Sequence, residues 1–185
     1  RKLKSKSHLL CPWVDEIARN PDVLDVYEDL IGPNIMAFAS RFWVKPGSDG
    51  SFVSWHQDSA YFGCDPHDMV TCWVALTPAN RGLDESKAVH MELEQGQFSI
   101  HNERTAHASG PNNTPDVRIG YSFFLIPTHV KSTLERRPAT LVRGVDEYGY
   151  WDTDPVPTEE SMGELIDQML KNNAQYTNPN FRQDA

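Results

Sequence analysis

The chain has 185 residues, a hydrophobic fraction of 39% and a net charge of −9 from 17 basic and 26 acidic side chains. This length predicts one domain with a sizeable core, and the acidic balance argues against nucleic-acid binding, which needs clustered Lys and Arg. No apolar run reaches the roughly 18 residues of a membrane span, and three cysteines without a CxxC pair favour a reducing, cytoplasmic setting.

Residues 1–33 are expected to form helical support. In "RNPDVLDVYEDLIGPN", Asn20 is a candidate N-cap and Pro21 stands at the first helical position. An apolar stripe follows at helical spacing, made of Val23, Val26, Tyr27 and Leu30. Gly32 and Pro33 predict the end of this helix.

From Asn34 the apolar period changes to two, which is typical of strands. In "IMAFASRFWVK" (35–45), the alternation predicts one face with Met36, Phe38, Phe42 and Val44, and an opposite face with Arg41, Trp43 and Lys45. Further strand-like runs are separated by turn-forming segments: 51–58, 69–77, 88–93, 97–101, 117–126 and 139–143. Residues 34–145 therefore predict a mainly β core, either an antiparallel sandwich or a barrel.

The C-terminal part, residues 146–185, is expected to hold a loop, a helix and a polar tail. The helix is predicted in "TEESMGELIDQMLKNN" (158–173), whose apolar residues align on one side: Met162, Leu165, Ile166 and Met169. The whole chain is thus predicted to be a single domain.

The stretch "SWHQDSAYF" (54–62) holds the first chemical signal. In a strand, residues two apart share a face, so His56 and Asp58 are predicted to project together and can chelate one cation. Taken alone, this pattern is weak evidence for a metal site and is more typical of a histidine at a strand edge that bonds a neighbouring aspartate.

The segment "HNERTAHASGPNNTPDVRIGYSFF" (101–124) supplies the second signal, because it carries His107 and, eleven residues later, Arg118. Two histidines and one carboxylate form the facial triad of non-haem Fe(II) oxygenases, with open positions for a 2-oxo acid and O₂. Arg suits the far carboxylate of such an acid, since it binds carboxylates bidentately. Gly120 is expected to leave room for a ligand, and Ser122 to offer a hydroxyl contact.

With these residues the chain resembles the phytanoyl-CoA dioxygenase family of Fe(II)/2-oxoglutarate oxygenases, which also includes the ectoine hydroxylases. The matching pieces are "WHQD" (55–58), "CWVALTPAN" (72–80), "ELEQGQFSIHNERTAHASGPN" (92–112) and Arg118 in "DVRIG". The resemblance implies a double-stranded β-helix, a jelly-roll or cupin-like fold, with flanking α-helices.

The resemblance also implies roles for individual residues. The iron ligands would be His56, Asp58 and His107. Arg118 would anchor 2-oxoglutarate, and the pocket for this co-substrate would also be lined by Gln57, Trp73 and Ser109, although Trp73 fits a plain core position equally well. His101, six residues before His107, is the rival for the second histidine ligand.

The activity so implied is hydroxylation of a C–H bond of a small-molecule substrate by Fe(II), 2-oxoglutarate and O₂, with formation of succinate and CO₂. Halogenating relatives replace the carboxylate ligand with a small residue, so Asp58 disfavours halogenation. Two alternatives stay open: a non-catalytic β-helix domain that binds a ligand as sensor or carrier, and a cupin-type metal isomerase, which would not need Arg118.

The substrate is not identified by the sequence, which also leaves the oligomeric state open. Candidate substrate contacts are Arg41, Tyr61, Tyr148 and Trp151. The segment "LVRGVDEYGYWD" (141–152) could form an aromatic, acidic wall for a cation, or a surface loop. An acid could be held instead by Arg41, Lys45 or Arg143. No nucleic-acid or membrane partner is expected.

One departure from the family pattern concerns spacing. His107 follows Asp58 by only 49 positions (58 to 107), fewer than the resemblance implies. After "LTPAN" the relatives continue into a glycine-containing strand and a variable segment, whereas here "RGLDESKAV" follows. We therefore predict that Asn80 and Arg81 are not bonded neighbours in the native protein, and that the absent piece borders the iron pocket.

Overall fold

The structure is a computed structural model that describes residues 6–10, 12–79 and 88–155. Its helical elements are η1 (Ser7–Leu9), α1 (Pro12–Ala18), α2 (Pro21–Ile31) and α3 (Ser59–Phe62). Its strands are β1 (Ile35–Lys45), β2 (Val53–His56), β3 (Cys64–Asp65), β4 (Val70–Ala75), β5 (Phe98–Asn102), β6 (His107–Ser109), β7 (Arg118–Pro127), β8 (Lys131–Ser132), β9 (Pro138–Arg143) and β10 (Asp152–Thr153). The predicted break at Asn80 and the predicted helix over residues 158–173 lie outside the described residues.

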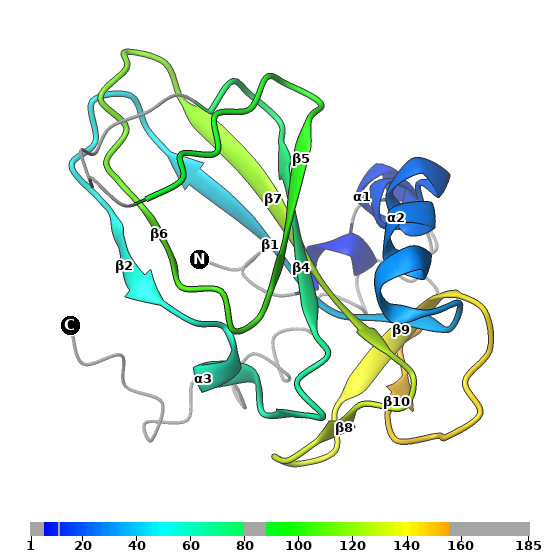
Figure 1. The fold of residues 1–185 in the computed structure, drawn as a ribbon. Coiled ribbons are helices and arrows are strands. Elements are labelled where there is room, and N and C mark those ends of the chain that lie inside the picture. Colours follow the sequence, from blue (N-terminus) through cyan, green and yellow to red (C-terminus); the bar gives the residue numbers. More distant parts are fainter. Residues whose placement is uncertain (1–5, 11, 80–87, 156–185) are drawn as a thin grey trace.

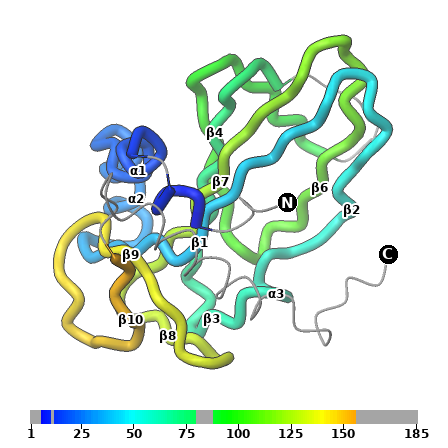
Figure 2. Tube along the Cα trace, turned by 180° about the vertical axis from the view of Figure 1, so that it is seen from behind, coloured from blue at the N-terminus to red at the C-terminus, as the bar shows by residue number. Residues whose placement is uncertain are grey.

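The strands form a large sheet that faces a small one. The large sheet has six strands in the order β10-β9-β1-β7-β4-β5, while β2 pairs with β6 and β3 with β8. Helices α1 and α2 cover one side of the large sheet, and the β2–β6 pair lies over the other side (Figures 1 and 2). The prediction of a mainly β, double-stranded β-helix with flanking helices is confirmed.

Helix α2 begins and ends where the sequence predicts. Asn20 is the N-cap, with its side chain accepting a hydrogen bond from the backbone N–H of Asp22, and Pro21 is the first helical residue. The predicted apolar stripe is partly wrong, because Val26 is 39% and Leu30 57% exposed. The buried residues of this helix are Val23, Leu24 and Tyr27.

Strand β1 departs from the simple alternation that its sequence suggests. Its pairing with β7 slips at Phe38, because Ala37 pairs with Leu125 and Ala39 already pairs with Phe124. This β-bulge exchanges the two faces of the strand beyond it. Lys45 is consequently buried while the predicted core residue Val44 is 57% exposed, and the predicted common face of Phe38 and Val44 is wrong.

The two faces of the large sheet carry different cores. On the side of the helices lies the helix-side cluster, whose buried members include Val14, Leu24, Tyr27, Ile35, Cys72, Tyr121, Phe123 and Leu125. On the opposite side lies the inner aromatic cluster, whose buried members include Met36, Phe38, Met69, Phe124, Ile126, Val130 and Trp151. The inner aromatic cluster lies at one end of this side of the large sheet, and because its side chains are buried this end is closed to water.

Most strand predictions are confirmed, but short segments differ, among them β3, β8 and β10, which the alternation did not mark. Residues 88–93 do not form a strand, since only Leu93 makes an isolated bridge, to Ala79. Strand β6, in contrast, forms in a segment that the alternation did not mark, because it pairs with β2. Among the described residues, no helix has the length and apolar character that a membrane crossing demands.

Candidate metal centre

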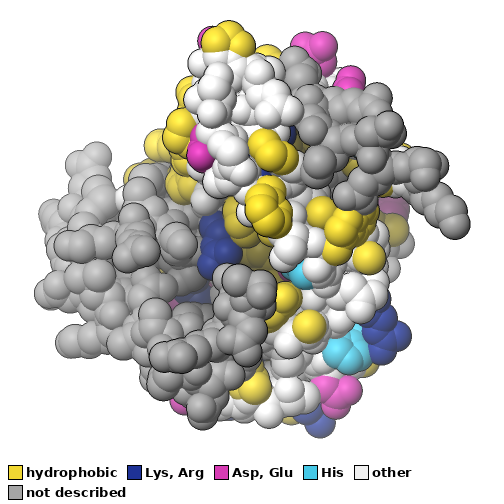
Figure 3. Space-filling model, turned by 90° about the vertical axis from the view of Figure 1, so that its left-hand side faces the viewer, with side chains coloured by type: hydrophobic (Ala, Val, Ile, Leu, Met, Phe, Trp, Pro, Cys, Tyr) yellow, Lys and Arg dark blue, Asp and Glu magenta, His cyan; other side chains and the backbone are white. Residues whose placement is uncertain are grey.

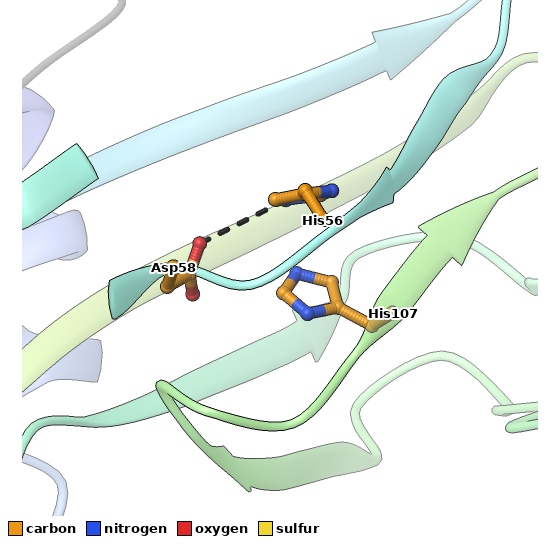
Figure 4. A group of neighbouring side chains, drawn as sticks. All are labelled: His56, Asp58 and His107. Carbon is orange, nitrogen blue, oxygen red and sulfur yellow. Dashed lines mark ion pairs between the residues drawn. The ribbon is translucent and has the colours of Figure 1, made fainter. Parts of the chain in front are cut away.

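Three side chains converge between the two sheets. His56 is the last residue of β2, and Asp58 stands two positions further along the chain. His107 is the first residue of β6 and pairs directly with His56 in the β2–β6 ladder. One potential ligand atom from each of the three lies within 4.8 Å of the other two. The three side chains point toward one another (Figure 4), with Asp58 Oδ1 at 3.8 Å from His56 Nε2.

Both imidazoles of this triad are oriented by the same kind of hydrogen bond, from Nδ1 to a backbone carbonyl. His56 Nδ1 lies 2.8 Å from the carbonyl oxygen of Ser54, and His107 Nδ1 lies 3.0 Å from that of Thr105. Because a carbonyl only accepts, each Nδ1 carries the proton and each Nε2 keeps its lone pair. A metal-ligating histidine is typically held in this way, which fixes its tautomer.

The electrostatics of the triad favour the forms that bind a cation. Asp58 is 6% exposed, and burial raises its pKa. Hydrogen bonds and the nearby His107 and His101 outweigh this, so the pKa of Asp58 is lowered overall. Burial also lowers the pKa of His107, aided by the neighbouring His101 and His56. An ionised carboxylate and a neutral imidazole are the forms that ligate a metal.

The route by which Asp58 reaches the triad differs from the prediction. The predicted strand 51–58 ends at His56, and Asp58 has helical backbone angles at the start of α3. The two side chains therefore meet across a strand-to-helix turn and do not share a strand face. The predicted convergence is present, but the geometry proposed for it was wrong.

Arg118 and Lys45 form a cationic corner on the inner side of the large sheet. They are cross-strand partners at the ends of β7 and β1. The Arg118 guanidinium donates to Ser109 Oγ at 3.2 Å and to the Gly110 carbonyl at 2.9 Å. Lys45 Nζ donates to the carbonyls of Ser109 and Gly110 at 2.8 and 2.6 Å. The segment that follows His107 is thus tied to both cations.

The charge of Lys45 is sensitive to pH. Burial, with a smaller contribution from the positive charge of Arg118, lowers the pKa of Lys45 to about 8. Burial also lowers the pKa of Arg118. Sequence reasoning considered Lys45 only as a contact for an acidic substrate. Its placement beside Arg118 depends on the bulge in β1, which the alternation did not reveal.

Three of the other predicted co-substrate residues differ in how exposed they are and in what they contact. Ser122 is buried and accepts a hydrogen bond of 2.8 Å from Trp43 Nε1. The Trp73 ring lies against Gly120, where an added Cβ would come within 1.9 Å of it. The space at Gly120 is therefore taken by an indole, and the expectation that it leaves room for a ligand was wrong. Gln57 is exposed and donates to the carbonyl of Arg104.

The predicted substrate residues separate into two groups. Tyr61 lies near the triad, with its ring centroid 6.1 Å from that of His56. Burial lowers the pKa of Arg41, and the negative charge of Asp58 opposes this effect. Trp151, in contrast, is 3% exposed within the inner aromatic cluster, and its indole N–H donates to the carbonyl of Val130. The Tyr148 ring contacts His129 and Tyr150.

Arg143 does not face the space between the sheets. Its guanidinium pairs with Asp25 and Glu28 of α2, at 2.8 Å each, on the side of the large sheet that the helices cover. The other two candidate contacts for an acidic substrate, Arg41 and Lys45, lie on the inner side of the large sheet.

His101 lies beside the triad and not within it. Its ring centroid is 4.4 Å from that of His107, and its Nε2 is 3.7 Å from Asp58 Oδ2. The group of possible metal ligands found among the described residues consists of His56, Asp58 and His107. Thr71, which sequence reasoning did not single out, also reaches Asp58, and no signal in the sequence marks it.

Comparison with proteins of known sequence identifies similar chains, among them the following three. A probable alpha-ketoglutarate-dependent hypophosphite dioxygenase of Stutzerimonas stutzeri is 26% identical over 62% of this chain and 54% of its own length. A probable phytanoyl-CoA dioxygenase of Caenorhabditis elegans is 36% identical over 58% and 48%. The human peroxisomal phytanoyl-CoA dioxygenase is 27% identical over 53% and 41%. The chain spans about half the length of these curated relatives.

Solved structures agree with the fold. The nickel complex of the non-haem monooxygenase ThoJ is 30% identical, with a TM-score of 0.84 over 95% of this chain and 79% of that one. CytC3 with Fe(II) and alpha-ketoglutarate has a TM-score of 0.70 over 83% and 73%, at 23% identity, and supports the fold alone.

The family profile for phytanoyl-CoA dioxygenase matches residues 6–82 and 79–120, which together make up more than half of the chain. These two segments contain the triad, Arg118 and the whole of β1 to β6. The resemblance inferred from the motifs is thereby confirmed, and the chain belongs to the phytanoyl-CoA dioxygenase family.

Proposed function

We propose that this chain is an Fe(II)- and 2-oxoglutarate-dependent dioxygenase that hydroxylates a C–H bond of a small molecule, with formation of succinate and CO₂. The observation that carries the proposal is the convergence of His56, Asp58 and His107 within 4.8 Å, with the guanidinium of Arg118 bonded to Ser109, two residues after His107. The relative named as a probable alpha-ketoglutarate-dependent hypophosphite dioxygenase supports it.

The donor set fits iron(II). Two imidazole Nε2 atoms and one carboxylate form a facial triad that leaves adjacent positions open, and each Nδ1 is already held by a carbonyl. Iron bound here would supply the activation of O₂ and the oxidation itself. The protein would hold the ligands and keep bulk water out, through the inner aromatic cluster at the far end of the site.

The cationic corner fits the far carboxylate of 2-oxoglutarate. Arg118 can bind a carboxylate with two parallel hydrogen bonds, and Lys45 adds a second positive charge on the neighbouring strand. Both cations are held by the carbonyls after His107. The corner is therefore linked to the triad through the short strand β6. Ser109 supplies a hydroxyl at the same place.

For the substrate we propose a small molecule that carries an anionic group, bound near Arg41. Arg41 has its guanidinium carbon 4.9 Å from the centroid of the Trp43 ring, which orients it. Hydrophobic side chains gather on the face that Figure 3 shows. Within and next to β2 and α3, Phe52, Trp55 and Tyr61 are exposed. The name of the hypophosphite dioxygenase, which refers to a small anion, is consistent with this class.

Turnover of 2-oxoglutarate tests the function. Purified protein with Fe(II), 2-oxoglutarate and O₂ would be screened against small carboxylates, phosphonates and, as a contrast, amines, with succinate and oxygenated product measured together. We expect equal amounts of succinate and hydroxylated product with one anionic compound, and none with Asp58→Ala. Tight ligand binding without succinate would indicate the non-catalytic alternative, and product formed without 2-oxoglutarate would indicate an isomerase.

We also propose that the native protein carries a further segment between Asn80 and Arg81. The family profile supports this, since it matches in two pieces that meet at residues 79–82. The spacing of 49 positions between Asp58 and His107 points the same way. Intact mass and peptide mapping of the protein from its natural source test it. A peptide that runs directly from Asn80 into Arg81 would exclude the proposal.

A further inference from the structure

Asp58 occupies a helix-capping position without capping the helix. It stands at the N-cap of α3, yet its side chain accepts no hydrogen bond from that helix, although aspartate at this position usually does so. The backbone N–H groups that such a side chain would cap, those of Ala60 and Tyr61, donate instead to the carbonyls of Gln57 and Asp58. The carboxylate of Asp58 can therefore turn toward the large sheet.

Two cross-strand neighbours of the large sheet meet the turned carboxylate. Thr71 on β4 and His101 on β5 are directly paired. The Thr71 hydroxyl donates to Asp58 Oδ2 at 2.9 Å, and His101 Nε2 lies 3.7 Å from the same oxygen. That nitrogen is buried and has no hydrogen-bond partner among the described residues. Oδ1, in contrast, lies toward His56 Nε2.

We propose that Thr71 and His101 are positioning residues of the metal centre, which hold Oδ2 of Asp58 so that Oδ1 alone ligates the ion. The inference rests on the proposed function. A carboxylate that ligates through one oxygen leaves the adjacent positions open for the 2-oxo acid and O₂, whereas a bidentate carboxylate would occupy one of them. Thr71 makes the larger contribution, because 3.7 Å exceeds hydrogen-bond length.

Substitutions of Thr71 give the direct test. Thr71→Val keeps the shape of the side chain and removes the hydroxyl, whereas Thr71→Ser keeps the hydroxyl. The dissociation constant for Mn(II), used as a redox-stable probe, would be measured by calorimetry. We expect Thr71→Val to bind the ion about 10- to 100-fold more weakly, the usual effect of losing such a partner, and Thr71→Ser to bind close to the wild-type value.

A spectroscopic signal separates positioning from folding. The charge-transfer absorption of the anaerobic Fe(II) and 2-oxoglutarate complex reports on the geometry of the ligands. We expect it to shift in Thr71→Val and to be restored in Thr71→Ser. His101→Phe keeps a ring against His107 without a donor, and we expect a smaller loss of Mn(II) affinity than in Thr71→Val.

A matched control lies a few residues along the chain. The Thr77 hydroxyl accepts from the backbone N–H of Ile119 at 2.8 Å, so Thr77→Val should lower the melting temperature and leave Mn(II) affinity unchanged. If Thr71→Val keeps the wild-type Mn(II) affinity and the wild-type absorption, the positioning role is wrong and the proposed function still stands. If the wild-type protein binds neither metal nor 2-oxoglutarate, the proposed function itself is wrong. If Thr71→Val does not fold, Thr71→Ala is judged by the same two outcomes.

Discussion

The two ends of the space between the sheets are built from the same strands and have opposite character. At one end, Phe38 of β1 and Phe124 of β7 pack in the inner aromatic cluster. At the other end, the same two strands end in Lys45 and Arg118. Each of the two strands thus contributes to the core at one end and to the wall of the site at the other. Packing of the aromatic end fixes the position of the polar end.

The bulge at Phe38 makes this division possible. Without it, regular alternation would put Lys45 on the face of Ile35 and Ala37, which belong to the helix-side cluster. With it, Lys45 joins Arg118 at the polar end. Such bulges re-aim side chains next to active sites. The comparison leads to four predictions, ordered from the largest expected effect to the smallest.

Loss of a triad residue should abolish metal binding at the polar end. In His107→Ala or Asp58→Ala only two ligands remain, and we expect neither bound Fe(II) nor succinate. Metal content of the purified variants checks this. His101→Ala removes no ligand and should retain most of its metal. Loss of iron in His101→Ala alone would show that the second histidine ligand has been misassigned.

Truncation of a side chain at the aromatic end should lower the stability of the protein and leave its metal affinity unchanged. Phe38 is fully buried and its ring contacts those of Phe62, Phe124 and Trp151. We expect Phe38→Ala to lower the free energy of unfolding by about 3–5 kcal/mol, the usual cost of such a cavity, as measured by urea denaturation. The Mn(II) affinity of the folded protein should stay at its wild-type value. Weaker Mn(II) binding with unchanged stability would contradict the division into two ends.

Removal of the Arg118 charge should weaken the binding of 2-oxoglutarate and leave the metal affinity unchanged. Losing one partner of a buried charge pair costs about 2–5 kcal/mol, so Arg118→Met should weaken 2-oxoglutarate binding about 30-fold or more. Calorimetry with the Mn(II) form measures both ligands. Arg136→Met removes an exposed arginine that pairs with Asp152 and should change neither. Unchanged 2-oxoglutarate affinity in Arg118→Met would assign the anchor to another residue.

The smallest effect concerns pH. The pKa of Lys45 is about 8, so its charge is present below this pH and is lost as the pH rises above it. The affinity for the 2-oxoglutarate dianion should therefore fall modestly between about pH 7 and 9. Lys45→Arg should remove this dependence and keep the affinity high, while Lys45→Met should bind weakly at every pH. A flat profile in the wild-type protein would speak against Lys45 as a second anchor.

Much of the site can be predicted from the local sequence. The residue types of His56, Asp58, His107 and Arg118 predict a facial triad with an anchor for a 2-oxo acid, and the motifs around them indicate the family. The roles of these residues can be predicted without knowledge of the fold, because metal ligation and carboxylate binding require particular side chains. The capped start and the glycine end of α2 are predictable for a similar reason, since they depend on neighbouring residues alone.

The sequence by itself determined which chemical groups are available, namely two imidazoles, a carboxylate and an arginine. Tertiary structure decided how they are held. A bulge in β1 places Lys45 beside Arg118, and the pairing of β4 with β5 brings Thr71 and His101 to Asp58. The Trp73 ring fills the space at Gly120. These contacts join residues far apart in the chain, and strand register, which depends on the packing of the whole sheet, decides them.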